Sequence, residues 1–274
     1  PLESLFSHGG ATVDELGRIL VIAGVDSSGD MGDAYEWDVA NGNAGGIEDR
    51  SGQESRQGFA LARDDLGRIL SIGGSSLAAL TTAYSGGDVE RYDAVNDQWT
   101  FLASMPTPVA DASAWNDGQG HVLVFGGYTT AGTRTANVAT YDLATDVWSD
   151  TAIPDMPTAR AGSQAVLGND GLLYVLGGST NSAVVSTVLV LDPVSATWAA
   201  GASMLQPREH FGCGIDGAGN IWAVGGDGTN TSEKMFTSTC PTIVAGPTGN
   251  AAYVGTVASL SIAVGGSGPL TFTW

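Results

Sequence analysis

The sequence predicts an all-β protein in which about five four-stranded sheets stack radially around a shared axis. Three observations lead to this fold class. Short apolar runs that end in a glycine pair recur about every fifty residues. The segments between them are rich in Val, Ile, Leu, Tyr and Trp and are interrupted by turn residues. No long segment keeps the 3.6-residue periodicity of an amphipathic helix.

The glycine pairs define the repeat. The five runs are GRILVIAG (17–24), GRILSIGG (67–74), GHVLVFGG (120–127), GLLYVLGG (171–178) and GNIWAVGG (219–226). Their last glycines are 50, 53, 51 and 48 residues apart, which is too even for chance. We interpret the glycines as sites of positive φ and of close approach by the next unit. A phosphate cradle is disfavoured because no helix N-terminus follows them.

A hairpin turn precedes each apolar run. An aspartate stands ten positions before the last glycine in four copies, at Asp14, Asp64, Asp117 and Asp216, and the fourth copy has Gly168 there with Asp170 nearby. A glycine then opens each run, at Gly17, Gly67, Gly120, Gly171 and Gly219. Asp bonds the turn backbone and Gly accepts positive φ, so Asp-x-x-Gly predicts a tight hairpin between two strands.

Two further strands follow each glycine pair. In four copies, an aromatic or apolar residue followed by Asp occurs after the glycine pair: Trp37-Asp38, Tyr92-Asp93, Tyr141-Asp142 and Leu191-Asp192. Three copies add a Trp six residues later, at Trp99, Trp148 and Trp198, and a Met-containing loop comes next. Because these aromatic residues recur once per unit, we expect them to pack between units and not to form a sugar-stacking platform. In the fifth unit, residues 232–239 take the place of the third strand.

Together these features resemble the kelch repeat over roughly residues 8–240. The resemblance implies a kelch-type β-propeller of the galactose-oxidase-like central-domain type, and we assign residues 1–240 to it. Kelch propellers usually have six or seven blades, so we expect one or two more blades before Pro1. A five-unit ring closed by residues 1–7 is the alternative. The first copy departs from the pattern by lacking the Trp after Asp38.

Residues 241–274 have a different texture. Two alternating runs, Val257–Val264 and Leu270–Trp274, flank the sequence GGSGP. This resembles the first strands of a bacterial immunoglobulin-like domain. A partial sandwich leaves apolar surface uncovered, so we expect this segment to pack poorly or to lean on the propeller.

Composition excludes several classes of partner. The chain of 274 residues has 29 acidic and 10 basic residues and a formal net charge of −19. Nucleic acids and anionic membrane surfaces need clustered Lys and Arg, so we expect neither as a partner. No run of about 18 apolar residues occurs, so we expect no membrane insertion. Cys213 and Cys240 fall on strands that are not neighbours in the repeat; we expect no bridge, with a disulfide as the alternative.

The sequence offers little catalytic chemistry. A copper-radical oxidase of this fold would resemble two tyrosines and two histidines around the metal, with one Tyr bonded to Cys. Here the only histidines are His8, His121 and His210, none of which adjoins a Tyr. There is no G-x-S-x-G motif. We therefore expect no cofactor and no catalytic metal. Asp26, Asp30 and Asp33 are interpreted as a solvated acidic loop, with calcium binding as the alternative.

The resemblance also implies where a ligand binds. In the kelch arrangement, the loops that lead into the innermost strands and those after each glycine pair converge on one face. Those loops carry the candidate ligand-binding residues Arg56, Tyr128, Arg134, Arg160, Asn181, Arg208, His210 and Asp227, with Ser179, Glu209 and Asn230 close by. One hypothesis is that Arg160 and Arg208 bind an acidic or polyhydroxyl group. The alternative is that this arginine belongs to the repeat and bonds loop carbonyl groups.

These observations favour a non-catalytic extracellular binding or adhesion module that recognises a protein or a carbohydrate. We expect it to belong to a larger multidomain, exported bacterial protein at the cell surface or secreted, because charge density is low and Lys234 is the only lysine. One alternative is a kelch-fold carbohydrate-active enzyme, an oxidase, epimerase or lyase. It predicts a channel lined by His and carboxylates. The other is a structural spacer without a pocket.

Overall fold

The computed structural model describes residues 9–22, 34–38, 43–47, 56–75, 87–236, 242–243 and 264–265. All regular structure in these ranges is β, and none of it is helical. No helix that could cross a membrane occurs among them. Several features named from the sequence lie outside the described residues: the acidic loop with Asp26, Asp30 and Asp33, the ring closure by residues 1–7, His8 and Cys240.

The five repeats form five antiparallel sheets, here called blades 1 to 5. Blade 1 contains β1 (Gly10–Val13), β2 (Ile19–Ile22), β3 (Ala34–Asp38) and β4 (Asn43–Ile47). Blade 2 contains β5 (Ala60–Arg63), β6 (Ile69–Ile72), β7 (Val89–Asp93) and β8 (Gln98–Phe101). Blade 3 contains β10 (Ser113–Asn116), β11 (His121–Phe125), β13 (Val138–Asp142) and β14 (Val147–Ser149). Blade 4 contains β15 (Gln164–Leu167), β16 (Leu173–Leu176), β17 (Val188–Asp192) and β18 (Thr197–Ala200).

Blade 5 differs from the others. It contains β19 (Gly212–Ile215), β20 (Asn220–Val224) and β21 (Ser232–Phe236), so its described part has three strands. The third strand lies where the sequence predicted it, within residues 232–239. Two small additions complete the described strands: β9 (Val109–Ala110) pairs with β12 (Tyr128–Thr129), and β22 (Thr242–Ile243) pairs with β23 (Val264–Gly265). Of the segment predicted to be immunoglobulin-like, only this last pair is described.

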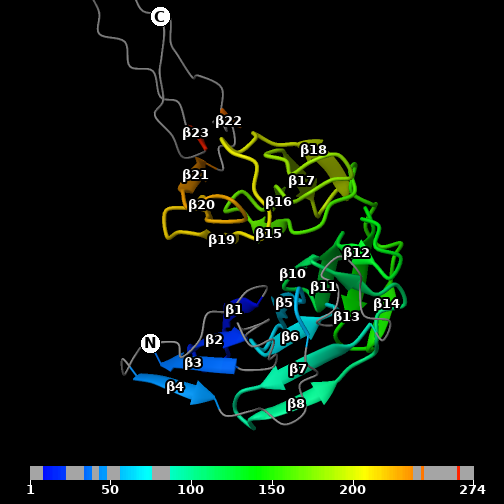
Figure 1. Ribbon diagram of the computed structural model, residues 1–274, viewed down its shortest axis with the longest axis vertical. Helices are drawn as coiled ribbons and strands as arrows, with labels where there is room; N and C mark the ends of the chain where they lie inside the picture. The colour runs from blue at the N-terminus through cyan, green and yellow to red at the C-terminus, as the bar shows by residue number, and fades with distance from the viewer. Residues whose placement is uncertain are drawn as a thin grey trace, which may run out of the picture.

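The blades follow one another around a central space, as Figure 1 shows by the progression from blue to orange. Within each blade the strands pair in chain order, and the first strand lies innermost. Neighbouring inner strands pack together in the order β1, β5, β10, β15 and β19. The all-β propeller with about five blades is therefore confirmed.

Apolar side chains fill the interfaces between blades, because successive strand residues point to opposite faces of a sheet. Blade 2 illustrates this alternation. Ile69 and Tyr92 pack toward Leu20 and Ile22 of blade 1, whereas Leu70 and Ile72 of blade 2 pack toward blade 3. Corresponding clusters join blade 3 to blade 4 and blade 4 to blade 5. Each described blade thus has one face for the preceding blade and one for the following blade.

The predicted aromatic packing is confirmed. Tyr92 and Trp99 have ring centroids 5.1 Å apart, and Tyr141 and Trp148 are 4.9 Å apart. Tyr141 belongs to the apolar cluster between blades 2 and 3, and Trp148 packs against it. The Trp148 indole donates to the Ala103 carbonyl at 2.8 Å, across the same interface. These residues are therefore part of the core and are not available as a sugar platform.

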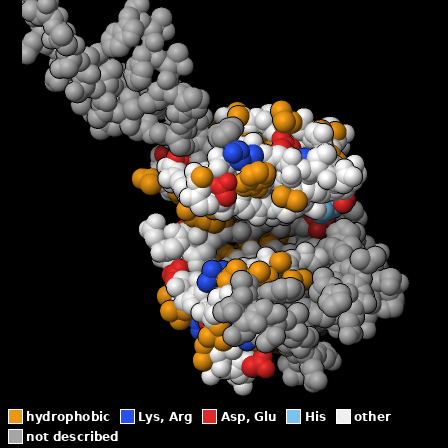
Figure 2. Space-filling model, turned by 90° about the vertical axis from the view of Figure 1, so that its left-hand side faces the viewer, with side chains coloured by type: hydrophobic (Ala, Val, Ile, Leu, Met, Phe, Trp, Pro, Cys, Tyr) orange, Lys and Arg blue, Asp and Glu red, His pale blue; other side chains and the backbone are white. Residues whose placement is uncertain are grey.

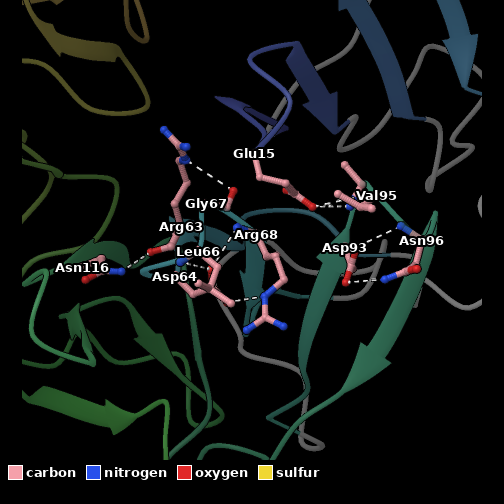
Figure 3. A network of polar contacts seen from close by, with 11 residues as sticks. Glu15, Arg63, Asp64, Leu66, Gly67, Arg68, Asp93, Val95, Asn96 and Asn116 are labelled. Carbon is pink, nitrogen blue, oxygen red and sulfur yellow. Dashed lines mark hydrogen bonds and ion pairs between the residues drawn. The ribbon is translucent and has the colours of Figure 1, made fainter.

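The aspartate turns form as predicted at the ends of the inner strands, here called the turn end. In blade 2, Asp64 Oδ1 accepts from the amides of Leu66 and Arg68, both at 2.9 Å, and Oδ2 accepts from Arg68 Nε at 2.6 Å. Gly67 has φ +87°. Figure 3 shows this turn beside Glu15 of blade 1, whose carboxylate accepts from the Ala94 amide of blade 2 at 2.6 Å. The turns therefore also link blades.

The glycine pairs of blades 2 to 5 adopt positive φ, and in blades 2, 3 and 4 the next blade passes close over the first glycine of the pair. Gly126 and Gly127 have φ +64° and +97°. A Cβ on Gly126 would lie 2.4 Å from the Arg160 carbonyl oxygen. The Gly127 amide donates to that same oxygen at 2.7 Å. The interpretation of the pairs as sites of close approach is thus confirmed.

Candidate functional site: the mouth of the central cavity

The five inner strands line a cavity of about 590 Å³. Its walls are mostly small residues of β1, β5, β10, β15 and β19, among them Gly10, Ala60, Ala114, Ala165 and Gly212. The hydroxyls of Ser113 and Ser163 are buried in this wall without a hydrogen-bond partner among the described residues.

Four residues at equivalent positions of the repeat ring one end of this cavity, which we call the mouth. They are Gly58, Asp111, Gly162 and His210, from blades 2, 3, 4 and 5. The amides of the last three donate to the carbonyl of the preceding residue in the series: Asp111 to Gly58 at 2.7 Å, Gly162 to Asp111 at 2.8 Å and His210 to Gly162 at 3.0 Å. This chain of backbone bonds fixes the blades relative to one another at the mouth.

All four mouth residues have left-handed backbone conformations, with φ between 51° and 64°. Glycine adopts this region freely, but Asp111 and His210 do so at a cost. The glycines also make room for the side chains. A Cβ on Gly162 would lie 3.0 Å from the His210 ring, and one on Gly58 would lie 2.5 Å from the Asp111 carboxylate.

His210 forms a bridge between two carboxylates. Its Nε2 lies 3.2 Å from Asp111 Oδ2, across blade 4, and its Nδ1 lies 2.9 Å from Asp227 Oδ2 in its own blade. Burial lowers the pKa of the imidazole, but hydrogen bonds and charge from Asp111 and Asp227 outweigh it and raise the pKa to about 9. The ring is therefore a cation at neutral pH, suited to holding a charge pair and not to acting as a general base.

A second polar group lies beside it, in the loops after the glycine pairs. The guanidinium of Arg134 lies 4.8 Å from the Tyr128 ring centroid. Its Nε and Nη2 donate to Ser179 Oγ of blade 4 at 3.1 and 3.0 Å. Tyr128 is buried, Arg134 is half-buried and Asn181 is exposed. Cation–π contact and hydrogen bonding thus fix a cation on this face.

The three repeat arginines lie deeper. Arg56, Arg160 and Arg208 are only 3%, 2% and 1% exposed. Arg160 Nη1 donates to the Gly177 and Thr187 carbonyls at 2.9 and 2.7 Å. Arg208 Nε pairs with Glu233 at 2.8 Å, and Arg56 pairs with Glu90. These contacts agree with the alternative in which the arginine bonds loop carbonyl groups. Because the three arginine side chains are buried, a ligand at the surface would not touch them.

Three candidate metal or redox features are also placed. Cys213 is a half-buried free thiol, and burial raises its pKa to about 12, which disfavours the thiolate. Cys240 lies outside the described residues. His121 is the first residue of β11, and its Nδ1 lies 2.8 Å from Asp117 Oδ2. Within the described ranges, no three His, Cys, Asp or Glu side chains form a group that could hold a metal ion.

His210 and Asp227 were among the candidates named from the sequence, but Asp111 was not. The signal was present in the repeat alignment: Asp111 stands where blades 2 and 4 have glycine and blade 5 has histidine. A carboxylate and an imidazole at equivalent positions of one ring face the same opening. That their side chains meet depends on Gly162 between them, which only the fold reveals.

Comparisons with known proteins agree with this architecture. The kelch motif family matches residues 162–205. The chain is 31% identical over 174 residues to the kelch-like protein terF of Aspergillus terreus, covering 59% of this chain and 37% of that protein. It is 29% identical over 150 residues to Kelch-like protein 35 of Mus musculus, covering 54% and 25%. The chain thus spans less than half the length of these relatives.

The solved structure of YjhT superimposes with a TM-score of 0.65 at 18% sequence identity, covering 81% of this chain and 72% of that one. This likeness concerns the fold. The chain therefore has the structure of a β-propeller and carries a kelch motif. Kelch-repeat proteins are generally protein-interaction modules.

Proposed function

We propose that this chain is a binding module that recognises a protein partner through the mouth. The observation that carries the proposal is the cluster of His210, Asp111 and Asp227, contributed by two blades and held by left-handed backbone at the rim of a polar cavity. Backbone strain of this kind is retained where surrounding structure has a use for it. Exposed loops on a rigid scaffold are where binding specificity usually resides.

Charge defines the partner further. The chain carries a net charge of −19, so long-range attraction favours a partner with basic residues. Asp227 exposes 60% of its side chain and can accept such a contact, whereas Arg134 and His210 offer two fixed cations for acidic or polar groups. The proposal places the protein outside the cell, at the surface or secreted. Its support is the composition noted above.

The test is selection from a random phage-displayed peptide library on the purified chain, with a glycan array as the second probe. We expect peptides enriched in Lys or Arg, whose binding falls about tenfold or more in Asp227→Asn, since one charged contact contributes about 1.5–3 kcal/mol. Asp65→Asn is the matched control, because it removes the same charge from an exposed site at the turn end.

Two outcomes contradict the proposal. Peptide binding that is equally weakened by Asp65→Asn would reflect net charge alone. Hits only on the glycan array, lost in Asp227→Asn, would make the ligand a carbohydrate and replace the protein partner.

A further inference from the structure

The inner strand of blade 5 leaves one of its edges unpaired. In the described part of this blade the strand order is β19-β20-β21, so β19 is an edge strand. Its residues Gly212 and Cys213 line the central cavity, and Figure 1 shows the strand beside the central space. An unpaired edge offers backbone donors and acceptors to another extended chain.

The strand register identifies the backbone groups on this edge. The Asp216 amide donates to the Asn220 carbonyl at 2.9 Å, so these two residues form a hydrogen-bonded pair. Such pairs alternate along an antiparallel ladder, which makes Gly214 and Trp222 the next one. The intervening residues Cys213 and Ile215 therefore direct their N–H and C=O groups away from β20. No other described strand pairs with these groups, which we call the β19 edge.

Beside the β19 edge, one face of the strand carries only glycine. Gly212 and Gly214 lie on this face, opposite Val224 and Trp222 of β20. A Cβ on Gly214 would meet no atom within 4 Å, and the nearest atom to one on Gly212 would be the Val224 carbonyl oxygen, at 3.7 Å. The positions equivalent to Gly214 in the other blades hold larger residues: Thr12, Ala62, Trp115 and Val166. Glycine within a strand is typical of sites where another backbone approaches closely.

The two glycines leave apolar side chains of β20 uncovered. Val224 is 53% exposed and Trp222 is 37% exposed. They line a hollow of about 400 Å³ that also borders Gly212, Gly214 and Asp216. The Trp222 indole nitrogen donates to Asp216 Oδ2 at 2.9 Å, so the ring reaches toward β19. Figure 2 views the molecule from the side of β19 to β21 and shows a hollow bordered by hydrophobic side chains.

An extended chain matches both features at once. Successive residues of a strand point to opposite faces of the sheet, so alternate side chains of an added strand would lie in the hollow, beside Val224 and Trp222. The glycines leave room for these contacts across β19, as aromatic side chains do over glycines at sheet edges. The remaining backbone groups of the added strand would pair with Cys213 and Ile215.

Charge favours a basic occupant. Asp216 lies at the turn end of β19, and Asp111 and Asp227 lie at the mouth. The net charge of −19 adds long-range attraction for a basic segment. The same charge opposes the approach of a second copy of this chain.

We propose that the β19 edge binds an extended, basic segment of a partner protein as an added β-strand, with alternate apolar side chains against Val224 and Trp222. This inference rests on the proposed function and adds to it the mode of recognition. In such pairing, main-chain hydrogen bonds provide affinity and the pockets for alternate side chains provide specificity.

The first test uses synthetic copies of the peptides that phage display selects on this chain. Each copy is N-methylated at one backbone position, which removes an amide donor and blocks pairing there. Because every second residue of an added strand faces β19, we expect affinity to fall roughly tenfold or more at alternate positions and little at those between. Titration calorimetry measures the affinities. A peptide held by its side chains alone has no such period of two.

A matched pair of variants tests the protein side. Gly214→Val introduces the side chain that blade 4 has at this position, Val166, and fills the glycine face. Gly217→Val is the control, because a Cβ there also meets no atom within 4 Å but the residue lies outside β19. We expect Gly214→Val to weaken peptide binding roughly tenfold or more without lowering the Tm, since valine favours strands. Gly217→Val should leave the affinity unchanged.

Amide hydrogen exchange, followed by NMR, provides a measurement that needs no substitution. The Cys213 and Ile215 amides should exchange rapidly in the free chain and roughly tenfold or more slowly in the peptide complex. Slow exchange in the chain alone would overturn the proposal. If that protection rises with protein concentration, the occupant is a second copy. If it does not, the chain itself already covers the β19 edge.

Failure of this inference can be told apart from failure of the proposed function. Peptides that lose affinity in Asp227→Asn, but tolerate N-methylation equally at all positions and bind Gly214→Val normally, would bind the mouth without forming a strand. That result overturns the added strand and leaves the proposed function standing. A chain that selects no peptide contradicts both.

Discussion

The two ends of the propeller are built by different means. At the turn end, blades 1, 2, 3 and 5 use the same device, an aspartate that bonds the backbone of its own hairpin, as Asp14, Asp64, Asp117 and Asp216 do. At the mouth, one position of the repeat is occupied by Gly58, Asp111, Gly162 and His210 in successive blades, and the hydrogen bonds of these residues run between blades. Uniform local chemistry maintains the fold at one end, and blade-specific side chains create a site at the other.

The buried arginines sharpen this contrast, because even this repeated residue differs between blades near the mouth. Arg208 pairs with Glu233 on β21, and Arg56 pairs with Glu90 on β7. Blade 4 has Leu189 at the equivalent position, so the bonds of Arg160 within the described residues go to Thr187 and the Gly177 carbonyl and not to a carboxylate. Burial accordingly lowers the pKa of Arg160.

The largest expected effect comes from Arg208→Met. It leaves Glu233 buried without its cation, and we expect a loss of about 3–5 kcal/mol in the free energy of unfolding. Arg160→Met strands only carbonyl and hydroxyl groups and should cost about 1–3 kcal/mol. Chemical denaturation measures both. If the two substitutions lower the free energy of unfolding equally, the presence of Glu233 beside Arg208 makes no difference to stability between blades 4 and 5. Arg208→Met with Glu233→Leu should recover much of the loss.

The next effect is a pH dependence that originates at the mouth. The pKa of His210 is raised from 6.5 to about 9 in the folded state. Its stabilisation is therefore fully present below pH 6.5 and is lost as the pH rises through 9. The loss amounts to about 3 kcal/mol. Urea denaturation at a series of pH values should show this decline, and His210→Asn should remove it. A decline that is unchanged in His210→Asn would assign it to other groups.

The smallest effect belongs to the turn end. Asp64→Ala removes two hydrogen bonds from backbone amides and one ion pair within a single hairpin. We expect the free energy of unfolding to fall by about 2 kcal/mol. Asp14→Ala should cost a similar amount, because the same bonds recur in blade 1. Neither should shift the titration of His210, as followed by NMR. A shifted titration, or very different losses, would show that the two ends are coupled or that the turns are not equivalent.

Much of the fold followed from local pattern. The glycine pairs, the Asp-x-x-Gly turns and the positions of Tyr92 and Trp99 each predicted the structure that is found, because each depends on backbone geometry or packing within one repeat. The candidate site was predicted only in part. His210 and Asp227 were named as candidates from their loops. Arg160 was offered as a ligand-binding residue, with bonding of loop carbonyl groups as the alternative, and its 2% exposure agrees with that alternative. Burial depends on neighbouring blades, which a local pattern does not reveal.

By itself, the sequence determined the repeat, the strands and the order of the blades, since hydrophobic alternation and turn chemistry act over a few residues. Only the tertiary structure decided which side chains meet at the mouth and which faces lack a neighbour. Asp111 and His210 are 99 residues apart in the chain, and they meet because Gly162 leaves room between them. Val224 resembles its buried equivalents in sequence but is exposed because no described blade follows it.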